Sequence, residues 1–191
     1  MSATMFDKIW DQHVVEDLGD GVQLLHVDRH LMHELSGQRG QLELKKRGIK
    51  MRDPGLTIGS MDHVVSTVPG AKGGNAPWAD KMIESFRQQS REAGVKIYDI
   101  GQDGQGIVHV VGPELGFTLP GSTLLCGDSH TCTHGALGAL AWGIGTSELT
   151  HVLATQTIVQ QRPKTMRARF DGKPGRAVAA KSLVGEVRRH R

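Results

Sequence analysis

Apolar and polar positions along the chain change period several times, and each change predicts the end of one element and the start of another. Helical spacing over residues 4–13 predicts a first helix. A short apolar strand follows through Val27, and residues 29–35 then show helical spacing, with Asp28 placed to cap that helix. The N-terminal part is therefore expected to run helix, strand, helix.

Three apolar runs in the middle of the chain predict buried strands, at residues 95–100, 106–112 and 122–128. Residues 79–93 have the spacing of a helix, and Gly94 is expected to end it because glycine accepts the left-handed conformation of a helix terminus. These elements alternate as they do in proteins that cover a sheet with helices.

Segments rich in glycine and small residues frame these elements. Residues 52–74 indicate a turn, a short strand and a turn, and residues 135–160 indicate a small-residue segment that leads into a helix continuing through Ile158. The alternation predicts an α/β fold in α/β/α layers with a largely parallel sheet. We expect residues 1–161 to form this layered part and residues 162–191 a basic tail that frays at its end.

The formal net charge of +3 is unevenly distributed. Residues 162–191 carry ten Lys or Arg and two acidic residues, which leaves a net charge of −5 on the preceding residues. A nucleic-acid-binding surface usually adds aromatic stacking partners to its basic groups, and this tail offers only Phe170. Nucleic-acid binding is therefore disfavoured.

The N-terminal residues and the cysteines indicate the compartment. Acidic residues stand where a signal peptide needs a cationic start and an apolar run, and no apolar stretch reaches membrane-spanning length. Cys126 and Cys132 are too few for a disulfide framework, and their spacing matches no common zinc pattern. We expect a soluble cytoplasmic protein.

Chemically active residue types follow two of the predicted strands. The segment CGDSHTCTHG delivers Asp128, Ser129 and His130 to a glycine-rich turn directly after an apolar run. In open α/β sheets ligands gather at the carboxyl ends of strands, so these residues are candidates for acid–base or ligand-binding roles. An ordinary turn with a surface histidine would give the same pattern.

The segment SMDHVVST places Asp62 next to His63 just after a turn. A neighbouring carboxylate favours the charged imidazole, which suits the protonation of a leaving group. Adjacent residues on a strand point to opposite faces, however, so the pair need not be in contact. As a dipeptide the signal remains open to a purely structural interpretation.

Other histidines are ambiguous. His109 lies inside an apolar run, where a buried core histidine is the usual explanation. Another cluster lies between residues 26 and 33, and its members are His26, Asp28, Arg29, His30 and His33. At helical spacing His30 and His33 would share one face, either as a metal-binding pair or as a polar helix surface. An independent metal enzyme using His63, His109 and His130 is a further alternative, although no established metal, P-loop or GxSxG motif is present.

Four segments together resemble the large subunits of 3-isopropylmalate dehydratases, which are members of the aconitase family. They are LLHVDRHLMHE, MDHVVST, YDIGQDGQGIVHVVGPELGFTLPG and CGDSHTCTHGALGALAWGIGTSELTHVLATQT. The resemblance covers about residues 4–184, with the segments in the same order and spacing. It implies an aconitase-like α/β fold and a hydro-lyase that interconverts 2-isopropylmalate and 3-isopropylmalate through isopropylmaleate in leucine biosynthesis.

The resemblance also implies roles for individual residues. Asp62 and His63 match the pair that protonates the departing hydroxyl, and His109 matches a histidine that pairs with Asp128. A second group, which lines the cluster and substrate in the family, corresponds to Asp128, Ser129 and His130. His33 falls where aconitases carry a glutamine that contacts the substrate.

The same resemblance implies a 4Fe-4S cluster and a small subunit as partner. The cluster cysteines of the family lie downstream of Arg191, so Cys126 and Cys132 are not expected to be ligands. The sequence is therefore interpreted as an N-terminal fragment, inactive by itself, produced by a premature stop, a frameshift or deliberate shortening. Homoaconitase, a methylmalate or citraconate dehydratase, and a non-catalytic fragment that docks on partner subunits remain alternatives.

Overall fold

The computed structural model describes residues 2–179. The chain divides into two units, Met1–Gln161 and Arg162–Arg191. Within the second unit, the described residues 162–179 form no helix or strand, and nearly all of them are exposed. The fraying expected at the end of the chain falls mainly on residues 180–191, which lie outside the described residues. All the elements below belong to the first unit.

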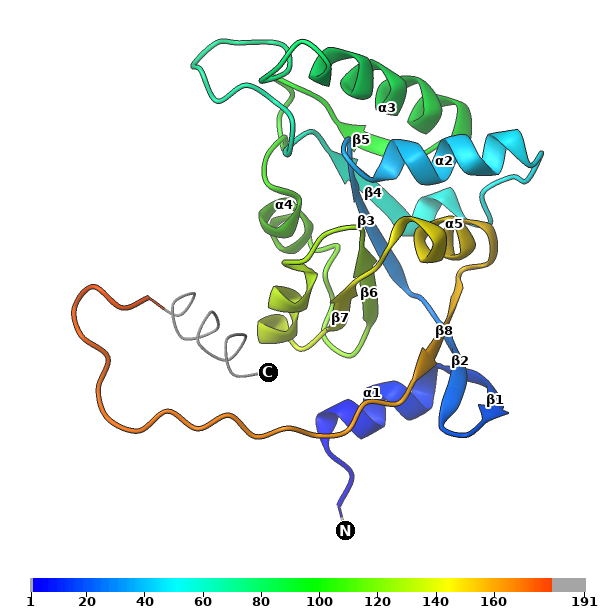
Figure 1. The fold of residues 1–191 in the computed structure, drawn as a ribbon, viewed down its shortest axis with the longest axis vertical. Coiled ribbons are helices and arrows are strands. Elements are labelled where there is room, and N and C mark those ends of the chain that lie inside the picture. Colours follow the sequence, from blue (N-terminus) through cyan, green and yellow to red (C-terminus); the bar gives the residue numbers. More distant parts are fainter. Residues whose placement is uncertain (1, 180–191) are drawn as a thin grey trace. The chain divides into compact units, whose positions relative to one another are not determined.

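A five-stranded parallel sheet forms the centre of the first unit (Figure 1). In spatial order its strands are β5 (Lys96–Tyr98), β4 (Thr57–Ser60), β3 (Arg29–His33), β6 (Thr123–Cys126) and β7 (Leu140–Gly143). The three inner strands are almost entirely buried. The predicted α/β fold with a largely parallel sheet is therefore confirmed.

Helices cover both faces of this sheet (Figure 1). On one face lie α2 (Gly37–Lys46), α3 (Ala79–Ala93) and α5 (Thr146–Thr155). On the other lie α4 (Val108–Glu114) and the 3-10 helix η2 (Thr131–Leu137). Successive residues of β3 point to opposite faces of the sheet. Met32 therefore packs with Phe86 of α3 on one face, and Leu31 packs with Val108 of α4 on the other. The result is an α/β/α arrangement.

A second, antiparallel sheet of three strands lies beside α1 (Met5–His13). Its order is β1 (Val14–Gly19), β2 (Val22–His26) and β8 (Thr157–Gln161). The indole N–H of Trp10 on α1 donates to Gln23 of β2 at 2.6 Å. A further 3-10 turn, η1 (Pro54–Leu56), precedes β4. No helix among residues 2–179 has the length and apolar character needed to cross a bilayer.

Several sequence-based predictions are confirmed. The first helix begins after Thr4, whose hydroxyl accepts the Asp7 backbone N–H in a capping box. Helix α3 ends at Gly94, which adopts a left-handed conformation with φ of 75°. The runs at 95–100 and 122–128 contain β5 and β6; β6 is fully buried as predicted, whereas β5 lies at the sheet edge and is not buried. Local sequence signals were sufficient to predict these elements, because the helix caps and apolar runs agree with the tertiary structure.

The helix predicted over residues 29–35 is wrong, because these residues contain β3. His30 pairs with Thr57 on one side and with Leu125 on the other. Two neighbouring strands and a buried position outweigh the helical spacing of the segment. Asp28 therefore caps no helix there, and the next helix, α2, begins at Gly37.

The strand predicted over residues 106–112 is also wrong, because α4 occupies this place and carries His109 in its first turn. The carboxylate of Asp62 accepts the backbone N–H of Val108 at 2.6 Å and so satisfies a free donor at the helix start. The helix predicted to continue through Ile158 ends at Thr155. Gln156 is left-handed with φ of 59°, and Ile158 pairs with Leu25 in the antiparallel sheet.

Candidate active site

The carboxyl ends of β3, β4 and β6 meet at one edge of the parallel sheet, and the candidate residues gather there. His33 ends β3, Asp62 and His63 follow β4, and Asp128 follows β6. His109 reaches the same place from α4. Because neighbouring parallel strands bring their carboxyl ends together, residues distant in sequence form one hydrogen-bonded group.

His63 lies between two carboxylates. Its Nδ1 contacts Asp62 Oδ1, and its Nε2 lies 2.8 Å from Asp128 Oδ2. Ionised carboxylates only accept hydrogen bonds, so both ring nitrogens must carry hydrogen and the ring is an imidazolium. The hydrogen bond with Asp62 is the main reason why the pKa of His63 is raised to about 9, against the opposing effect of burial and with further help from Asp128.

Asp128 is the centre of the group. Its Oδ1 accepts from His109 Nε2 at 2.8 Å and from the His130 backbone N–H at 2.7 Å. Burial alone would raise the pKa of Asp128, but the hydrogen bonds from His130, His109 and His63 outweigh burial and hold the pKa below its usual range. His130 Nδ1 also lies 3.2 Å from Oδ1, so Asp128 is an anion that the side chains of three histidines contact.

His109 is followed by a second buried histidine. His109 Nδ1 lies 3.0 Å from Nε2 of His134, and His134 Nδ1 lies 3.0 Å from the hydroxyl of Thr118. Burial, aided by the neighbouring His109, lowers the pKa of His134 to about 4, so this ring is neutral. Sequence reasoning gave His134 no role, and its local sequence carries no signal of its contacts with His109 and Thr118.

His33 and His63 are stacked. Their ring centroids are 3.7 Å apart, with planes inclined by 13°. Burial, followed by the positive charge of His63, lowers the pKa of His33 to about 4. A neutral ring thus covers one face of the charged one. The substrate contact that the resemblance implies for His33 stays a prediction.

His30 does not share the face of His33, as the helical interpretation required. Successive strand residues alternate, so His30 points into the helix layer on the opposite side of the sheet from the site. Among the described residues it has no hydrogen-bond partner for either ring nitrogen, and burial lowers its pKa to about 3. His30 is a core residue.

The other members of the predicted 26–33 cluster lie at the opposite, amino end of β3. Asp28 Oδ2 lies 2.6 Å from His13 Nε2 and accepts the Thr123 backbone N–H at 2.9 Å. His26 Nε2 is 3.8 Å from the other oxygen of Asp28. These contacts join α1 to the parallel sheet and do not extend the site.

Two sets of side chains lie close enough to suggest a metal ion: His33 with His63 and Asp128, and His33 with Glu34 and Asp62. An ion must lie near the plane of each imidazole that binds it, which two stacked, nearly parallel rings do not permit for His33 and His63. In the other set, both carboxylates already accept backbone N–H groups. The geometry fits proton transfer better than metal binding.

The two cysteines do not fit the ligand set of an iron-sulfur cluster. Cys126 is fully buried in β6, where burial raises the pKa of its thiol well above the usual value. Cys132 is exposed on η2. A cluster needs several thiolates directed at one point. Neither cysteine is therefore a candidate cluster ligand, and the candidate acid–base groups are the histidines and carboxylates at the sheet edge.

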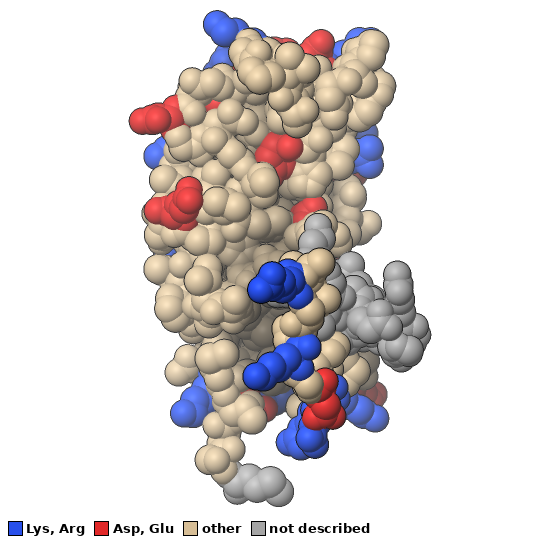
Figure 2. Space-filling model, turned by 90° about the vertical axis from the view of Figure 1, so that its left-hand side faces the viewer, with Lys and Arg blue, Asp and Glu red and all other residues tan. Residues whose placement is uncertain are grey.

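Ser129 and His130 are exposed at the open side of the group, whereas Asp62 and Asp128 are largely buried. Gly143 supports this turn, since an added Cβ there would lie 2.3 Å from the Asp128 carbonyl oxygen. In the upper half of Figure 2, acidic side chains are scattered over a mostly uncharged face. The two carboxylates of the site are thus largely internal.

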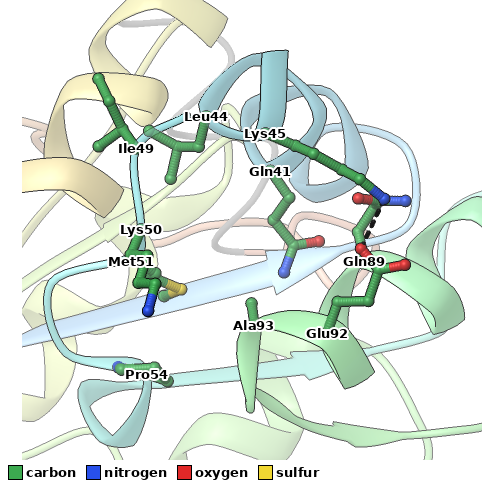
Figure 3. A pocket seen from close by; sticks show the side chains of 10 residues that line it. All are labelled: Gln41, Leu44, Lys45, Ile49, Lys50, Met51, Pro54, Gln89, Glu92 and Ala93. Carbon is green, nitrogen blue, oxygen red and sulfur yellow. Dashed lines mark hydrogen bonds and ion pairs between the residues drawn. The ribbon is translucent and has the colours of Figure 1, made fainter. Parts of the chain in front are cut away.

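A groove of about 430 Å³ lies elsewhere, between α2, α3 and the segment before β4 (Figure 3). Gln41, Lys45 and Glu92 are among its lining residues, and Lys45 Nζ pairs with Glu92 at 2.7 Å. None of the residues at the carboxyl edge of the sheet lines this groove. This groove and the candidate residues therefore lie in different parts of the structure.

A parallel sheet with an Asp–His–Asp array at its carboxyl edge defines an α/β protein equipped for acid–base chemistry. A sequence profile of the aconitase family (aconitate hydratase) matches residues 7–190, and the chain belongs to that family. The predicted family is thereby confirmed.

Three relatives are each named 3-isopropylmalate dehydratase large subunit. Those from Bradyrhizobium diazoefficiens, Roseiflexus castenholzii and Anaeromyxobacter dehalogenans are 54%, 46% and 45% identical to this chain. The alignments cover 95%, 96% and 95% of the chain but only 38%, 40% and 39% of the relatives. The chain thus spans about two fifths of their length.

Proposed function

We propose that this chain supplies the acid–base side of the active site of a 3-isopropylmalate dehydratase large subunit. The supporting observation is the imidazolium of His63, held between Asp62 and Asp128. Such a ring is charged at neutral pH and already oriented, as a general acid must be. The relatives named above direct the proposal to 2- and 3-isopropylmalate as substrates and to leucine biosynthesis.

In the proposed reaction His63 donates a proton to the substrate hydroxyl, which leaves as water when the C–O bond breaks. A base outside the described residues removes hydrogen from the neighbouring carbon, and the electron pair of that C–H bond forms the double bond of isopropylmaleate. Water adds in the reverse sense to give the isomer. Asp62 and Asp128 stabilise the imidazolium before transfer, and His109 fixes Asp128.

Substrate contacts are assigned to the residues at the open side. Ser129 and His130 are exposed beside Asp128 and offer hydrogen bonds to a carboxylate. His33 covers the ring of His63 and is neutral, so it can accept or donate without adding charge. The proposed enzyme also contains a small subunit and a 4Fe-4S cluster, whose cysteine ligands would come from outside the described residues.

A chimaera tests the proposal. Residues 1–161 replace the corresponding segment of the Bradyrhizobium large subunit, which is assembled with its own small subunit. We expect hydration of isopropylmaleate, and a loss of about 10²- to 10⁴-fold in kcat for His63→Gln, the usual contribution of a general acid. His151→Gln, at an exposed histidine of α5, is the matched control and should keep full activity.

The substrate range separates the alternatives. Preference for citraconate or homoaconitate over isopropylmaleate would reject the leucine assignment in favour of a related hydro-lyase. An inactive chimaera that still assembles and holds its cluster would favour a non-catalytic role for this chain. Equal activities of the His63→Gln and His151→Gln variants would reject the assigned proton donor.

A further inference from the structure

Glu34 is a buried carboxylate at the carboxyl end of β3 that takes no part in the proton transfer described above. Its side chain is inaccessible to solvent. Oε2 accepts the backbone N–H of Asp62 at 3.0 Å, and Oε1 accepts those of His63 at 2.7 Å and Val64 at 2.5 Å. One side chain thus binds three consecutive backbone donors of the segment that carries the general acid.

The hydrogen bonds to Glu34 explain how the side chains of the adjacent residues Asp62 and His63 can be in contact. Neighbouring residues on an extended strand project to opposite faces, so their side chains cannot meet. The chain leaves β4 at Ser60 and turns, and the three N–H groups of residues 62–64 converge on Glu34. Successive N–H groups that converge on an anion form a nest, which holds the backbone in one conformation.

The energetics favour a single conformation. A buried carboxylate that lost its hydrogen bonds would be strongly destabilised, so the turn and the charge of Glu34 depend on each other. From this turn Asp62 directs one oxygen to His63 and the other to the Val108 N–H at the start of α4. The Asp62 side chain is therefore held at both ends, by its own backbone and by α4.

We propose that Glu34 is the positioning residue of the Asp62–His63 pair, its carboxylate holding the backbone of residues 62–64 in the turn that brings the two side chains together. Glu34 is not itself a proton donor, because its oxygens are directed at backbone N–H groups and not at the open side of the site. The catalytic meaning of this role rests on the function proposed above, whereas the positioning does not.

The first test uses the 191-residue chain with the substitution Glu34→Gln. A glutamine keeps one acceptor oxygen but sets its NH₂ group against at least one of the three backbone donors, so the turn should open and Asp62 should leave His63. Besides Asp62, the groups facing the His63 ring are Asp128 and the neutral His33. With Asp128 left as the remaining anion, we expect the pKa of His63, followed by NMR of its ring nitrogens, to fall from about 9 by about 1–2 units.

Two further variants control this measurement. Thr57→Val removes a buried hydroxyl on the same sheet that has no hydrogen-bond partner among the described residues, and it should leave the pKa of His63 unchanged. Glu34→Asp keeps the charge on a shorter side chain and should restore part of the shift. An unchanged pKa of His63 in a folded Glu34→Gln variant would overturn the proposal.

A measurement on the unsubstituted chain covers the case in which Glu34→Gln does not fold. Hydrogen exchange of the amides of residues 62–64 should be as slow as that of β4, although these residues lie outside the strand. Exchange as fast as that of exposed loop amides, such as those of residues 70–72, would show that the nest is not formed and would also overturn the proposal.

The chimaera separates this inference from the proposed function. There Glu34→Gln should lower kcat by about 10²-fold or more and change KM less, since the acid and not substrate binding is displaced. If the unsubstituted chimaera is inactive but the NMR shift occurs, the proposed function fails and the positioning stands. If the chimaera is active but the pKa of His63 does not change in Glu34→Gln, the proposed function stands and the positioning role of Glu34 fails.

Discussion

The polar groups at the carboxyl edge of the parallel sheet and those in the groove between α2 and α3 differ in burial and in connectivity. At the edge, His63, Asp128 and His109 form a continuous hydrogen-bonded series with separations of 2.8 Å. In the groove, Lys45 and Glu92 form a pair whose side chains are 55% and 45% exposed, and Gln88 also donates to Glu92 at 3.0 Å. Both regions contain opposite charges in contact, yet water reaches only the second pair freely.

The difference shows what burial does to charged groups. Low solvent access strengthens each electrostatic contact at the edge and moves the pKa values of His63 and Asp128 in opposite directions. The exposed pair in the groove is screened, and little free energy is expected from it. The edge and the groove therefore differ in the burial and connectivity of their polar groups.

The largest effect is expected for Asp128→Asn, which removes the anion between two histidines. Breaking a buried charged pair costs about 3 kcal/mol of unfolding free energy. Asp171→Asn makes the same chemical change at an exposed carboxylate paired with Arg169, where a change of less than about 0.5 kcal/mol is expected. Urea denaturation of both variants measures the contrast, and similar losses would contradict it.

The pH dependence of stability should be carried by His63. Its raised pKa means that its contribution is complete below its ordinary value of 6.5 and is lost as the pH rises through about 9. For this half-buried ring we expect a loss of about 2 kcal/mol over that interval after allowance for screening. Denaturation curves of His63→Gln, which should lack this decline, isolate the contribution from other titrating groups. A parallel decline in the variant would assign it elsewhere.

Local patterns in the sequence located half of this edge. Asp128 was a candidate because it directly follows an apolar run, and ligands gather at the carboxyl ends of strands. Asp62 and His63 were candidates because they form an Asp–His pair just after a turn. His109 was ambiguous from its surroundings and was assigned only through the family resemblance. Its contact with Asp128 depends on a helix where apolar residues predicted a strand.

The remainder depends on contacts between distant segments. Glu34 was unassigned because residues 29–35 resembled a helix, and only pairing with Thr57 and Leu125 makes them a strand that ends beside residues 62–64. His134 gained its place from a turn packed against His109 and Thr118. Propensity describes neighbours in sequence, so neither residue carried a local signal of its partner.

A smaller effect is expected at the far end of the histidine series. Thr118→Val removes the hydroxyl partner of His134 Nδ1 and should cost about 1 kcal/mol, the usual penalty for an unsatisfied buried nitrogen. Thr57→Val is matched to it, because that buried hydroxyl has no partner among the described residues, and it should be neutral or slightly stabilising. Equal effects on urea denaturation would mean that the series ends at His109.

The smallest effect is expected in the groove itself. A double-mutant cycle with Lys45→Ala and Glu92→Ala should give little or no coupling free energy, since both side chains are exposed and lose conformational freedom when they pair. That coupling should vanish in about 1 M salt, where the screening length is only about 3 Å. The cycle of His63→Gln with Asp128→Asn should instead keep most of its coupling at the same salt concentration, because the second pair is shielded from ions. A groove coupling that resists salt would show that this hollow also desolvates its charges, and the contrast between the two regions would then no longer hold.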